Sequence, residues 1–333
     1  MHQGVELKDG AVSDSFEMPI RAETVLKQVR AAGLGDVLAP NVYERSCYIG
    51  AHSERYVEFL ASAWDEWAAT GRTCQALPLV WPVRGLPSTA MPQFIDGKLG
   101  FFSMDAGSPI NAGTWSAVSS SANSALTGID ALARGDKAVF ALCRPPGHHA
   151  GREYMGGYCY LNNAAIAAQR CIAQGAKRVA VLDIDFHHGN GTQDIFYDRK
   201  DVLFVSIHGD PAVSFPYFSG FADERGRGEG LGFNLNLPLP KGTAMEQYAP
   251  ALQQAGLAIA DHAPDALVVS LGVDTFEGDP ISHFRLRTPD YLRVGEMLAS
   301  FGLPTLFVME GGYMVDEIGI NAVNVLLGFE GRA

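Results

Sequence analysis

The sequence has no run of 18 apolar residues, no apolar core near its start, and no cluster of lysine and arginine. The first two absences argue against a transmembrane helix and against a secretory signal in "MHQGVELKDGAVSDS". The third argues against sequence-independent binding to nucleic acid, since 25 basic residues face 37 acidic ones and the net charge is −12. We therefore expect a cytoplasmic protein that binds neither membranes nor nucleic acid.

Cysteine is scarce, and no CxxC pair is formed by Cys47, Cys74, Cys143, Cys159 and Cys171. Five cysteines in a chain of 333 residues argue against a disulfide scaffold and favour a reducing compartment. Internal repeats and linker-like segments are also lacking, so we expect one domain over residues 1–333. Hydrophobic residues make up 47% and charged residues 19%, as in a compact globular enzyme.

From residue 114 onward, helical patterns alternate with short runs rich in Val, Ile and Leu. The runs cover 137–143, 178–185, 202–208, 265–274 and 304–312, and the helical patterns cover 114–135, 163–175 and 288–302. Continuous apolar strands between helices indicate an α/β fold with a parallel sheet covered on both faces. Two earlier helices are expected over 21–33, ended by Gly33, and over 53–71, with Ser53 as N-cap.

The segment 71–113 fits no regular pattern. Its five prolines are Pro78, Pro82, Pro87, Pro92 and Pro109. A loop of about 40 residues usually serves a function or an interface. Trp81, Phe94, Phe101 and Phe102 make this one unlike a low-complexity linker. We expect an ordered insertion whose apolar groups pack against another surface, such as a second subunit.

Polar or glycine-rich clusters follow the predicted strands. They are "CRPPGHHAG", "DIDFHHGNG", "SIHGDP", "LGVDTFEGDP" and "MEGGY". In open α/β sheets, ligands bind outside the C-terminal ends of the strands. These clusters meet along one edge of such a sheet, so the sequence predicts a binding or active site there.

Within "VLDIDFHHGNG", Asp183, Asp185 and His187 stand at alternate positions and share one face unless the strand ends early. An oxygen and a nitrogen ligand two residues apart can close on one metal ion, and Asp274 is the natural third ligand. This donor set suits Zn²⁺, with Fe²⁺, Mn²⁺ or Co²⁺ as substitutes. Two alternatives stay open: a buried Asp–His hydrogen-bonded network, and a helix N-cap role for Asp274.

The turn "RPPGHHAG" carries the adjacent histidines His148 and His149. They are either exposed loop residues or bases with a pKa near neutrality beside an activated water. Asp183 and Asn190 are available to orient their far ring nitrogens. Tyr313, after "MEGG", is either a packed aromatic or a phenolic donor that stabilises an oxyanion when a carbonyl becomes tetrahedral.

The ordered set "RPPGHHA", "GGYCYLNNAAIAAQ", "LDIDFHHGNGTQDIF", "LGVDTFEGDPIS" and "EGGY" resembles the zinc-dependent deacetylases of the arginase–histone deacetylase fold. Within that family it is most similar to the bacterial acetylpolyamine amidohydrolases, over nearly the whole chain. The resemblance implies a three-layer fold whose mainly parallel sheet has about eight strands flanked by helices. Its active site would lie at the C-terminal strand ends.

The resemblance also implies roles for single residues. The implied zinc ligands are Asp185, His187 and Asp274. His148 would pair with Asp183 and His149 with Asn190, both beside the metal-bound water, while Tyr313 would hydrogen-bond the scissile carbonyl. His149 is the expected base, because its Asn partner favours the charged imidazole less than an Asp would.

Further positions match the substrate tunnel and the cation sites of the family. Tyr158 and Phe215 match the aromatic walls, and the backbone at Gly157 matches an amide acceptor. Relatives also bind K⁺ through main-chain carbonyls. The matching positions here are Asp183, Asp185, His187, Ser206 and Ile207, with a second site near Phe196, Arg199 and Val202.

The resemblance assigns the 71–113 segment to an insertion that narrows the active-site mouth and forms a homodimer. A narrow, acidic mouth favours small cationic acetylated amines, such as acetylputrescine, acetylcadaverine and acetylspermidine, over protein substrates. Glu6, Asp96 and Asp105 are candidates to bind a distal ammonium, or else they are solvated surface acids. Some polyamine-selective relatives carry Glu where Gly107 stands.

Other functions stay open at this point. They are deacetylation of acetyl-lysine in proteins or peptides, hydrolysis by an arginase-like pair of manganese ions, and non-catalytic binding of a metal or small molecule. The two-manganese site would need a further carboxylate where Asn190 stands. Relatives usually begin with an extra strand before the region of "GVELKDG", so the N-terminal edge of the sheet also stays open.

Overall fold

The computed structural model describes residues 4–8, 11–83 and 90–332. In that part of the chain, six parallel strands form a central sheet in the order β3-β8-β7-β4-β5-β6. Their bounds are Ala138–Ala141 (β3), Val179–Asp183 (β4), Val202–Gly209 (β5), Asn234–Leu239 (β6), Ala266–Leu271 (β7) and Thr305–Met309 (β8). The strands expected from the apolar runs are all present, which confirms the α/β prediction.

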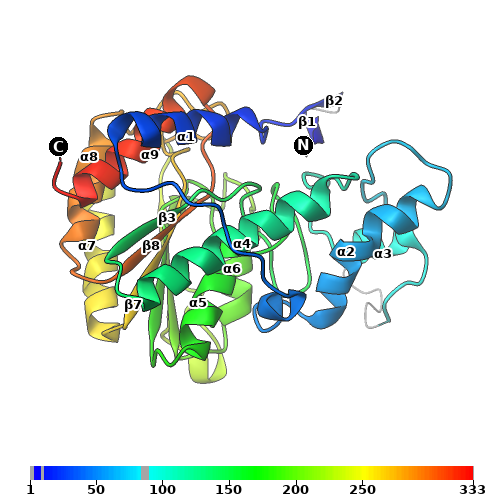
Figure 1. Ribbon diagram of the computed structural model, residues 1–333, viewed down its shortest axis with the longest axis horizontal. Helices are drawn as coiled ribbons and strands as arrows, with labels where there is room; N and C mark the ends of the chain where they lie inside the picture. Colours follow the sequence, from blue (N-terminus) through cyan, green and yellow to red (C-terminus); the bar gives the residue numbers. More distant parts are fainter. Residues whose placement is uncertain (1–3, 9–10, 84–89, 333) are drawn as a thin grey trace.

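The central sheet is smaller than the eight or so strands expected. Two further strands, β1 (Val5–Lys8) and β2 (Ala11–Asp14), pair with each other as an antiparallel hairpin. The hairpin lies apart from the sheet, near the N-terminus in Figure 1. Every residue of β2 is exposed, so this strand lacks the apolar faces that a buried sheet requires.

Nine α-helices lie in the described residues. They are α1 (Ile20–Ala32), α2 (Glu54–Ala68), α3 (Ile95–Phe101), α4 (Thr114–Ala133), α5 (Asn163–Ala173), α6 (Asn190–Phe196), α7 (Met245–His262), α8 (Asp290–Ala299) and α9 (Val315–Phe329). The predicted helix ends are confirmed at Gly33, where φ is +60°, and at Ser53, whose side chain accepts a hydrogen bond from the Tyr56 amide. None of these helices is long and apolar enough to cross a membrane.

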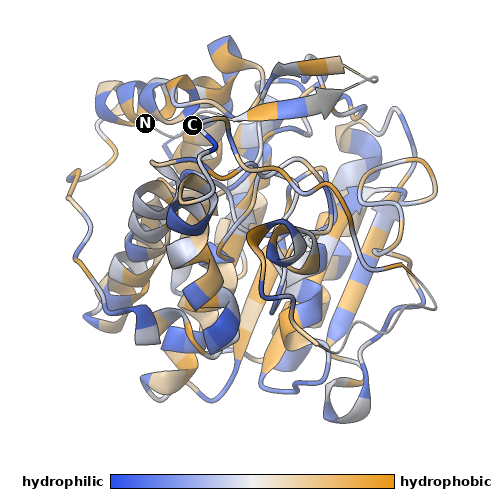
Figure 2. Ribbon diagram, turned by 90° about the vertical axis from the view of Figure 1, so that its right-hand side faces the viewer, coloured by the Kyte–Doolittle hydropathy of each residue, from blue (hydrophilic) through white to orange (hydrophobic). Residues whose placement is uncertain are grey.

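The sheet separates two layers of helices, as Figure 1 shows. Alternate strand residues point to opposite layers. Val181 packs with residues of α4, α5 and α6, whereas Leu182 packs with residues of α1, α7, α8 and α9. Figure 2 shows the apolar character of the strands between these layers. Burial on both faces explains why β4, β5, β7 and β8 are almost continuously apolar.

The 71–113 segment contains α3 and is closed at its base by paired backbone hydrogen bonds between Ala76 and Ile110. Leu99 and Phe102 are buried in the core, so the described part of the insertion is packed, as expected. Several other apolar side chains of the segment are exposed: Leu79, Val80, Val83, Met91 and Phe94. Pro87, predicted within this loop, lies outside the described residues.

Candidate active site

The end of β4 sets the geometry of the candidate site. The strand ends at Asp183, and the chain then bends, so Asp183, Asp185 and His187 do not continue one alternating strand face. The three residues therefore do not share one strand face, because the strand ends at Asp183. Asp183 Oδ1 accepts a hydrogen bond from the Asp185 amide, which fixes this bend. Asp183 turns toward the tandem histidines, while Asp185 and His187 turn toward Asp274.

Asp185, His187 and Asp274 form one buried cluster. His187 Nδ1 lies 3.0 Å from Asp274 Oδ2 and 3.3 Å from Asp185 Oδ1, and the possible ligand atoms all lie within 4.8 Å of one another. No helix begins at Asp274, which leaves the N-cap alternative without support. Two carboxylates and one imidazole that converge in this way are a suitable ligand set for a divalent cation.

Backbone groups hold these carboxylates in place. The Asp185 oxygens accept hydrogen bonds from the amides of His187 and Gly311, and Asp274 Oδ1 accepts one from the Phe186 amide, all at 2.8 Å. A Cβ at Gly311 would lie 2.4 Å from Asp274 Oδ2 and 2.5 Å from Asp185 Oδ2. Glycine is therefore required where the chain passes the cluster after β8.

The electrostatics of the cluster favour a cation. Burial and the charge of Asp185 raise the pKa of Asp274 to about 8. Burial opposes protonation of His187, yet its hydrogen bonds with Asp185 and Asp274 raise its pKa to about 10. In the described part of the chain, Asp185 and Asp274 form ion pairs only with histidines. A bound divalent ion would replace these protons and neutralise the buried carboxylates.

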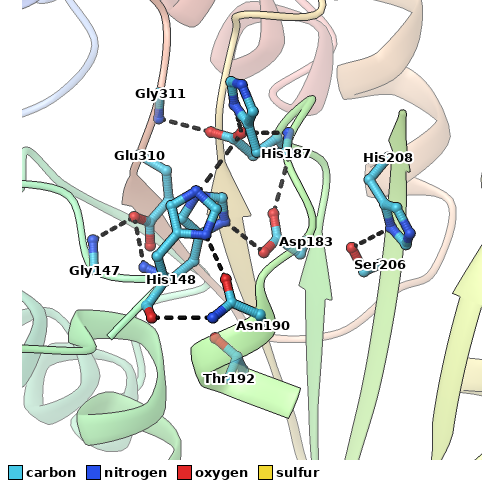
Figure 3. Close-up of polar contacts among 12 residues, drawn as sticks. Gly147, His148, Asp183, His187, Asn190, Thr192, Ser206, His208, Glu310 and Gly311 are labelled. Carbon is cyan, nitrogen blue, oxygen red and sulfur yellow. Dashed lines mark hydrogen bonds and ion pairs between the residues drawn. The ribbon is translucent and has the colours of Figure 1, made fainter. Parts of the chain in front are cut away.

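The tandem histidines His148 and His149 lie beside this cluster, and their ring centroids are 4.0 Å apart. His148 Nδ1 lies 2.9 Å from Asp183 Oδ2, and His149 Nδ1 lies 2.7 Å from Asn190 Oδ1. Figure 3 shows His148 beside Asp183, and Asn190 at the start of α6. Both rings are buried, so the exposed-loop alternative for this pair is wrong.

The two imidazoles differ in charge preference. Burial disfavours protonation of His148, but the charges of Asp185 and Asp183 raise its pKa to about 10. Burial and the neighbouring positive charge of His148 hold the pKa of His149 well below its usual range. Neither pKa therefore lies near the neutrality that the sequence suggested, and His149 is the imidazole that is neutral at pH 7.

Glu310 is a site residue to which the sequence analysis gave no role. It follows β8 directly, and its buried Oε2 accepts hydrogen bonds from the backbone amides of Gly147 and His148 at 2.6 and 3.2 Å (Figure 3). It thereby fastens the tandem-histidine turn to the sheet edge. An acidic residue directly after a wholly buried strand was the signal that could have identified it.

A cavity of about 650 Å³ opens onto the site. Its lining includes His149, His187 and Tyr313, together with Glu6, Asp105, Gly157, Tyr158 and Phe215. The rings of Tyr158 and Tyr313 pack edge-on with their centroids 5.6 Å apart. Those of His149 and Phe215 do the same with their centroids 5.0 Å apart. The structure thus brings together the histidines, the tyrosine donor and the aromatic walls named from the sequence.

Gly157 must be glycine for two reasons. Its φ is +53°, and a Cβ there would lie 2.4 Å from the His149 ring. Its amide donates to Asp105 Oδ2, and Asp105 Oδ1 accepts from the Gly107 amide. Both oxygens of Asp105 therefore already hold the loop that shapes the cavity wall.

The acidic residues proposed to bind a distal ammonium lie in different places in the structure. Glu6 lines the cavity and accepts a hydrogen bond of 2.5 Å from the Tyr158 hydroxyl. Asp96 lies outside the cavity lining, in α3, where Arg72 pairs with it and lowers its pKa. A substrate-binding role for Asp96 in this chain's own cavity is therefore not supported, because its charge is already compensated.

The expected K⁺ positions include two residues of the cluster, Asp185 and His187, and three residues of β4 and β5. Asp183 and Ser206 are paired across β4 and β5, with Ile207 next in β5. Ser206 Oγ lies 2.8 Å from His208 Nδ1. Of the second set, Phe196 ends α6 and Val202 begins β5, with Arg199 in the turn between them.

Comparison with known proteins agrees with this geometry. Residues 15–328 match the family described as the histone deacetylase domain. The chain is 59% identical to acetylpolyamine amidohydrolase 2 of Pseudomonas aeruginosa, over 99% of this chain and 96% of that protein. It is 50% identical to the acetylpolyamine amidohydrolase of Mycoplana ramosa, over 98% and 95%. The crystal structure of the acetylpolyamine aminohydrolase from Burkholderia pseudomallei superposes with a TM-score of 0.94, at 39% identity, covering 100% of this chain and 96% of that one.

Proposed function

The chain belongs to the histone deacetylase family, and from this membership we propose that it is a metal-dependent amidohydrolase that removes acetyl groups from acetylated polyamines. The observation that carries the proposal is a cavity lined together by His149, whose Nδ1 is engaged with Asn190, by His187 and by the acidic side chain of Glu6. This combination supplies a base, a metal ligand and an anionic group for a cationic substrate.

We propose Zn²⁺ as the metal, held by Asp185, His187 and Asp274, with Fe²⁺, Mn²⁺ or Co²⁺ as substitutes. When bound, such an ion polarises the amide carbonyl and lowers the pKa of water. We also propose K⁺ as a structural ion. Its oxygen donors would be main-chain carbonyls at the expected positions, Asp183, Asp185, His187, Ser206 and Ile207, of which Asp183 and Ser206 pair across β4 and β5.

The protein groups divide the proton and charge chemistry. His149 accepts the proton of the attacking water at Nε2, because Nδ1 is engaged with Asn190. It then returns that proton to the departing amine. His148 stays positively charged beside Asp183, and Tyr313 donates a hydrogen bond to the carbonyl oxygen as negative charge develops on it.

The cavity also supports the choice of substrate. Tyr158 and Phe215 line it, and a slender alkyl chain between them would direct its distal ammonium toward Glu6. The nearby Asp105 adds negative charge, and the chain as a whole carries −12. This negative field attracts cationic polyamines.

A substrate panel tests the proposal. We expect kcat/KM on acetylputrescine, acetylcadaverine or acetylspermidine to exceed that on an acetyl-lysine peptide by at least about tenfold, or 1.4 kcal/mol. A preference for the peptide would make the chain a protein or peptide deacetylase. Absence of turnover after loading with Zn²⁺ or Co²⁺ would favour a non-catalytic binding protein.

Metal stoichiometry separates this proposal from a two-manganese hydrolase. Asn190 is engaged with His149 and is not part of the carboxylate cluster, which supports a single ion. We expect about one divalent ion per chain by elemental analysis, in line with a three-ligand catalytic site. Two manganese ions per active chain would overturn the assignment.

We further propose that the chain forms a homodimer through the 71–113 insertion. The exposed apolar residues of that insertion, Leu79, Val80 and Phe94 among them, lie close together in sequence and Trp81 of the same loop lines the cavity. Light scattering should give twice the chain mass. The double substitution Leu79→Glu and Phe94→Glu should give the monomer, and a monomeric parent chain would refute the proposal.

A further inference from the structure

Asp279 holds the backbone of the oxyanion donor Tyr313. It lies in the loop after β7, and its Oδ2 accepts a hydrogen bond of 2.8 Å from the Tyr313 amide. Its Oδ1 accepts one of 3.1 Å from the amide of Ile281, a residue that lines the cavity. One carboxylate thus joins the loop after β7 to the loop after β8 and fixes two positions of the cavity wall.

Burying the Asp279 carboxylate costs free energy, which suggests that its hydrogen bonds have a structural role. Asp279 is buried, and among the described residues no lysine or arginine forms an ion pair with it. Burial accordingly raises its pKa to about 6. A buried carboxylate without a cation is expensive, and it persists where both oxygens serve hydrogen bonds. An asparagine offers one acceptor oxygen and could satisfy only one of the two amides.

The ring of Tyr313 is held by other groups. The Arg21 guanidinium lies 4.6 Å from the ring centroid, and the Tyr158 ring meets it edge-on. Arg21 is itself fixed by hydrogen bonds to the carbonyls of Glu310 and Gly312. These contacts restrain the orientation of the ring. The hydrogen bond from the Tyr313 amide instead restrains the backbone, and so the position of the Tyr313 Cα.

We propose that Asp279 is a positioning residue for Tyr313 in amide hydrolysis, an inference that rests on the proposed function. Its two oxygens accept hydrogen bonds from the backbone amides of Ile281 and Tyr313, so it acts on the reaction through the Tyr313 backbone. Its loss would let the hydroxyl drift from the carbonyl oxygen that it must meet. A misplacement of about 1 Å is enough to reduce a rate about a hundredfold.

A double-mutant cycle tests this role on the metal-loaded enzyme, with Asp279→Ala and Asp279→Asn made in the parent chain and in the Tyr313→Phe background. We expect Asp279→Ala to lower kcat about tenfold to a hundredfold with KM within about twofold. The same substitution should change kcat less than about twofold once the Tyr313 hydroxyl is gone. Asp279→Asn, which keeps one acceptor, should fall between the two.

Glu277→Gln is the matched control, since Glu277 is an exposed carboxylate of the same loop, and its kcat should not change. Equal losses of kcat in the two backgrounds would overturn the proposal, as would loss of bound metal in Asp279→Asn. Should Asp279→Ala not fold, the isosteric Asp279→Asn carries the cycle alone.

A fluorine resonance from 3-fluorotyrosine at position 313 gives a readout that does not depend on the substrate. We expect one sharp signal in the parent chain and a broadened or doubled signal in Asp279→Asn. An unchanged signal would overturn the positioning role even if the enzyme is active. An inactive parent chain with the expected spectral change would refute the proposed function, while still showing that Asp279 fixes the position of Tyr313.

Discussion

His149 Nδ1 lies 2.7 Å from Asn190 Oδ1, whereas its neighbour His148 pairs with the carboxylate of Asp183. The amide of Asn190 is itself oriented by contacts with Met104 and Tyr154. Two adjacent imidazoles thus have partners of different charge. The neutral partner leaves His149 as the base, while the anionic partner keeps His148 protonated.

Asn190→Asp should convert His149 to the behaviour of His148. A carboxylate at hydrogen-bond distance favours the protonated imidazole and should raise the pKa of His149 by about one to three units. Because the base must be neutral, the acid limb of the kcat/KM profile should move to higher pH by the same amount. A pH–rate profile measures this, and an unchanged acid limb would assign the base to another group.

Tyr313→Phe should remove one hydrogen bond to the developing oxyanion. Loss of such a donor costs about 3–4 kcal/mol of transition-state stabilisation, so kcat should fall about a hundredfold to a thousandfold. Tyr313 is not part of the carboxylate cluster, so metal content by elemental analysis should stay at the parent value. Turnover near that of the parent chain would contradict the role of the hydroxyl.

Glu310 should contribute to stability through two buried donors. Glu310→Leu leaves the amides of Gly147 and His148 without their acceptor, at a cost of about 1–3 kcal/mol for each unpaired group. Glu310→Gln keeps an oxygen in the same place and should lose much less. Urea unfolding of the two variants measures the difference, and equal destabilisation would mean that the carboxylate charge, not acceptance of these hydrogen bonds, is what matters.

Much of the sheet could be predicted because burial on both faces leaves a simple signal. β4, β5, β7 and β8 are runs of apolar residues, and each was identified. β6 was missed because it is an edge strand of sequence NLNLPL, in which Asn and Pro interrupt the apolar pattern. The helices α7 and α9 were not singled out either.

The site residues that directly follow strands could be predicted from the sequence. Those that act through contacts between distant loops could not. Asp185, His187 and Asp274 were found because parallel strands bring their C-terminal ends to one edge. Glu310 and Asp279 act by accepting hydrogen bonds from backbone amides of distant segments, and no spacing in the sequence encodes such contacts. For the same reason, only the folded chain separates Glu6, which lines the cavity, from Asp96, which pairs with Arg72.

His52 should make stability depend on pH. Its buried ring donates from Nδ1 to the Gly151 carbonyl and accepts at Nε2 from the Asn162 amide, so the folded state requires the neutral form. Burial lowers its pKa from 6.5 to about 4. The unfolded chain therefore binds a proton that the folded chain does not, and this contribution to stability is complete above pH 6.5 and is lost as the pH falls toward 4.

His52→Gln tests this because its amide offers one donor and one acceptor without titrating. Between pH 7.5 and 5.0, the parent chain should lose about 2 kcal/mol more unfolding free energy than the variant, at about 1.4 kcal/mol per pKa unit. Urea unfolding at both pH values gives the difference, which cancels titrations common to the two chains. His283→Gln is the control, since its ring is only partly buried and should carry less of the dependence. If His52→Gln follows the same pH dependence as the parent chain, the ring is not held neutral by Asn162.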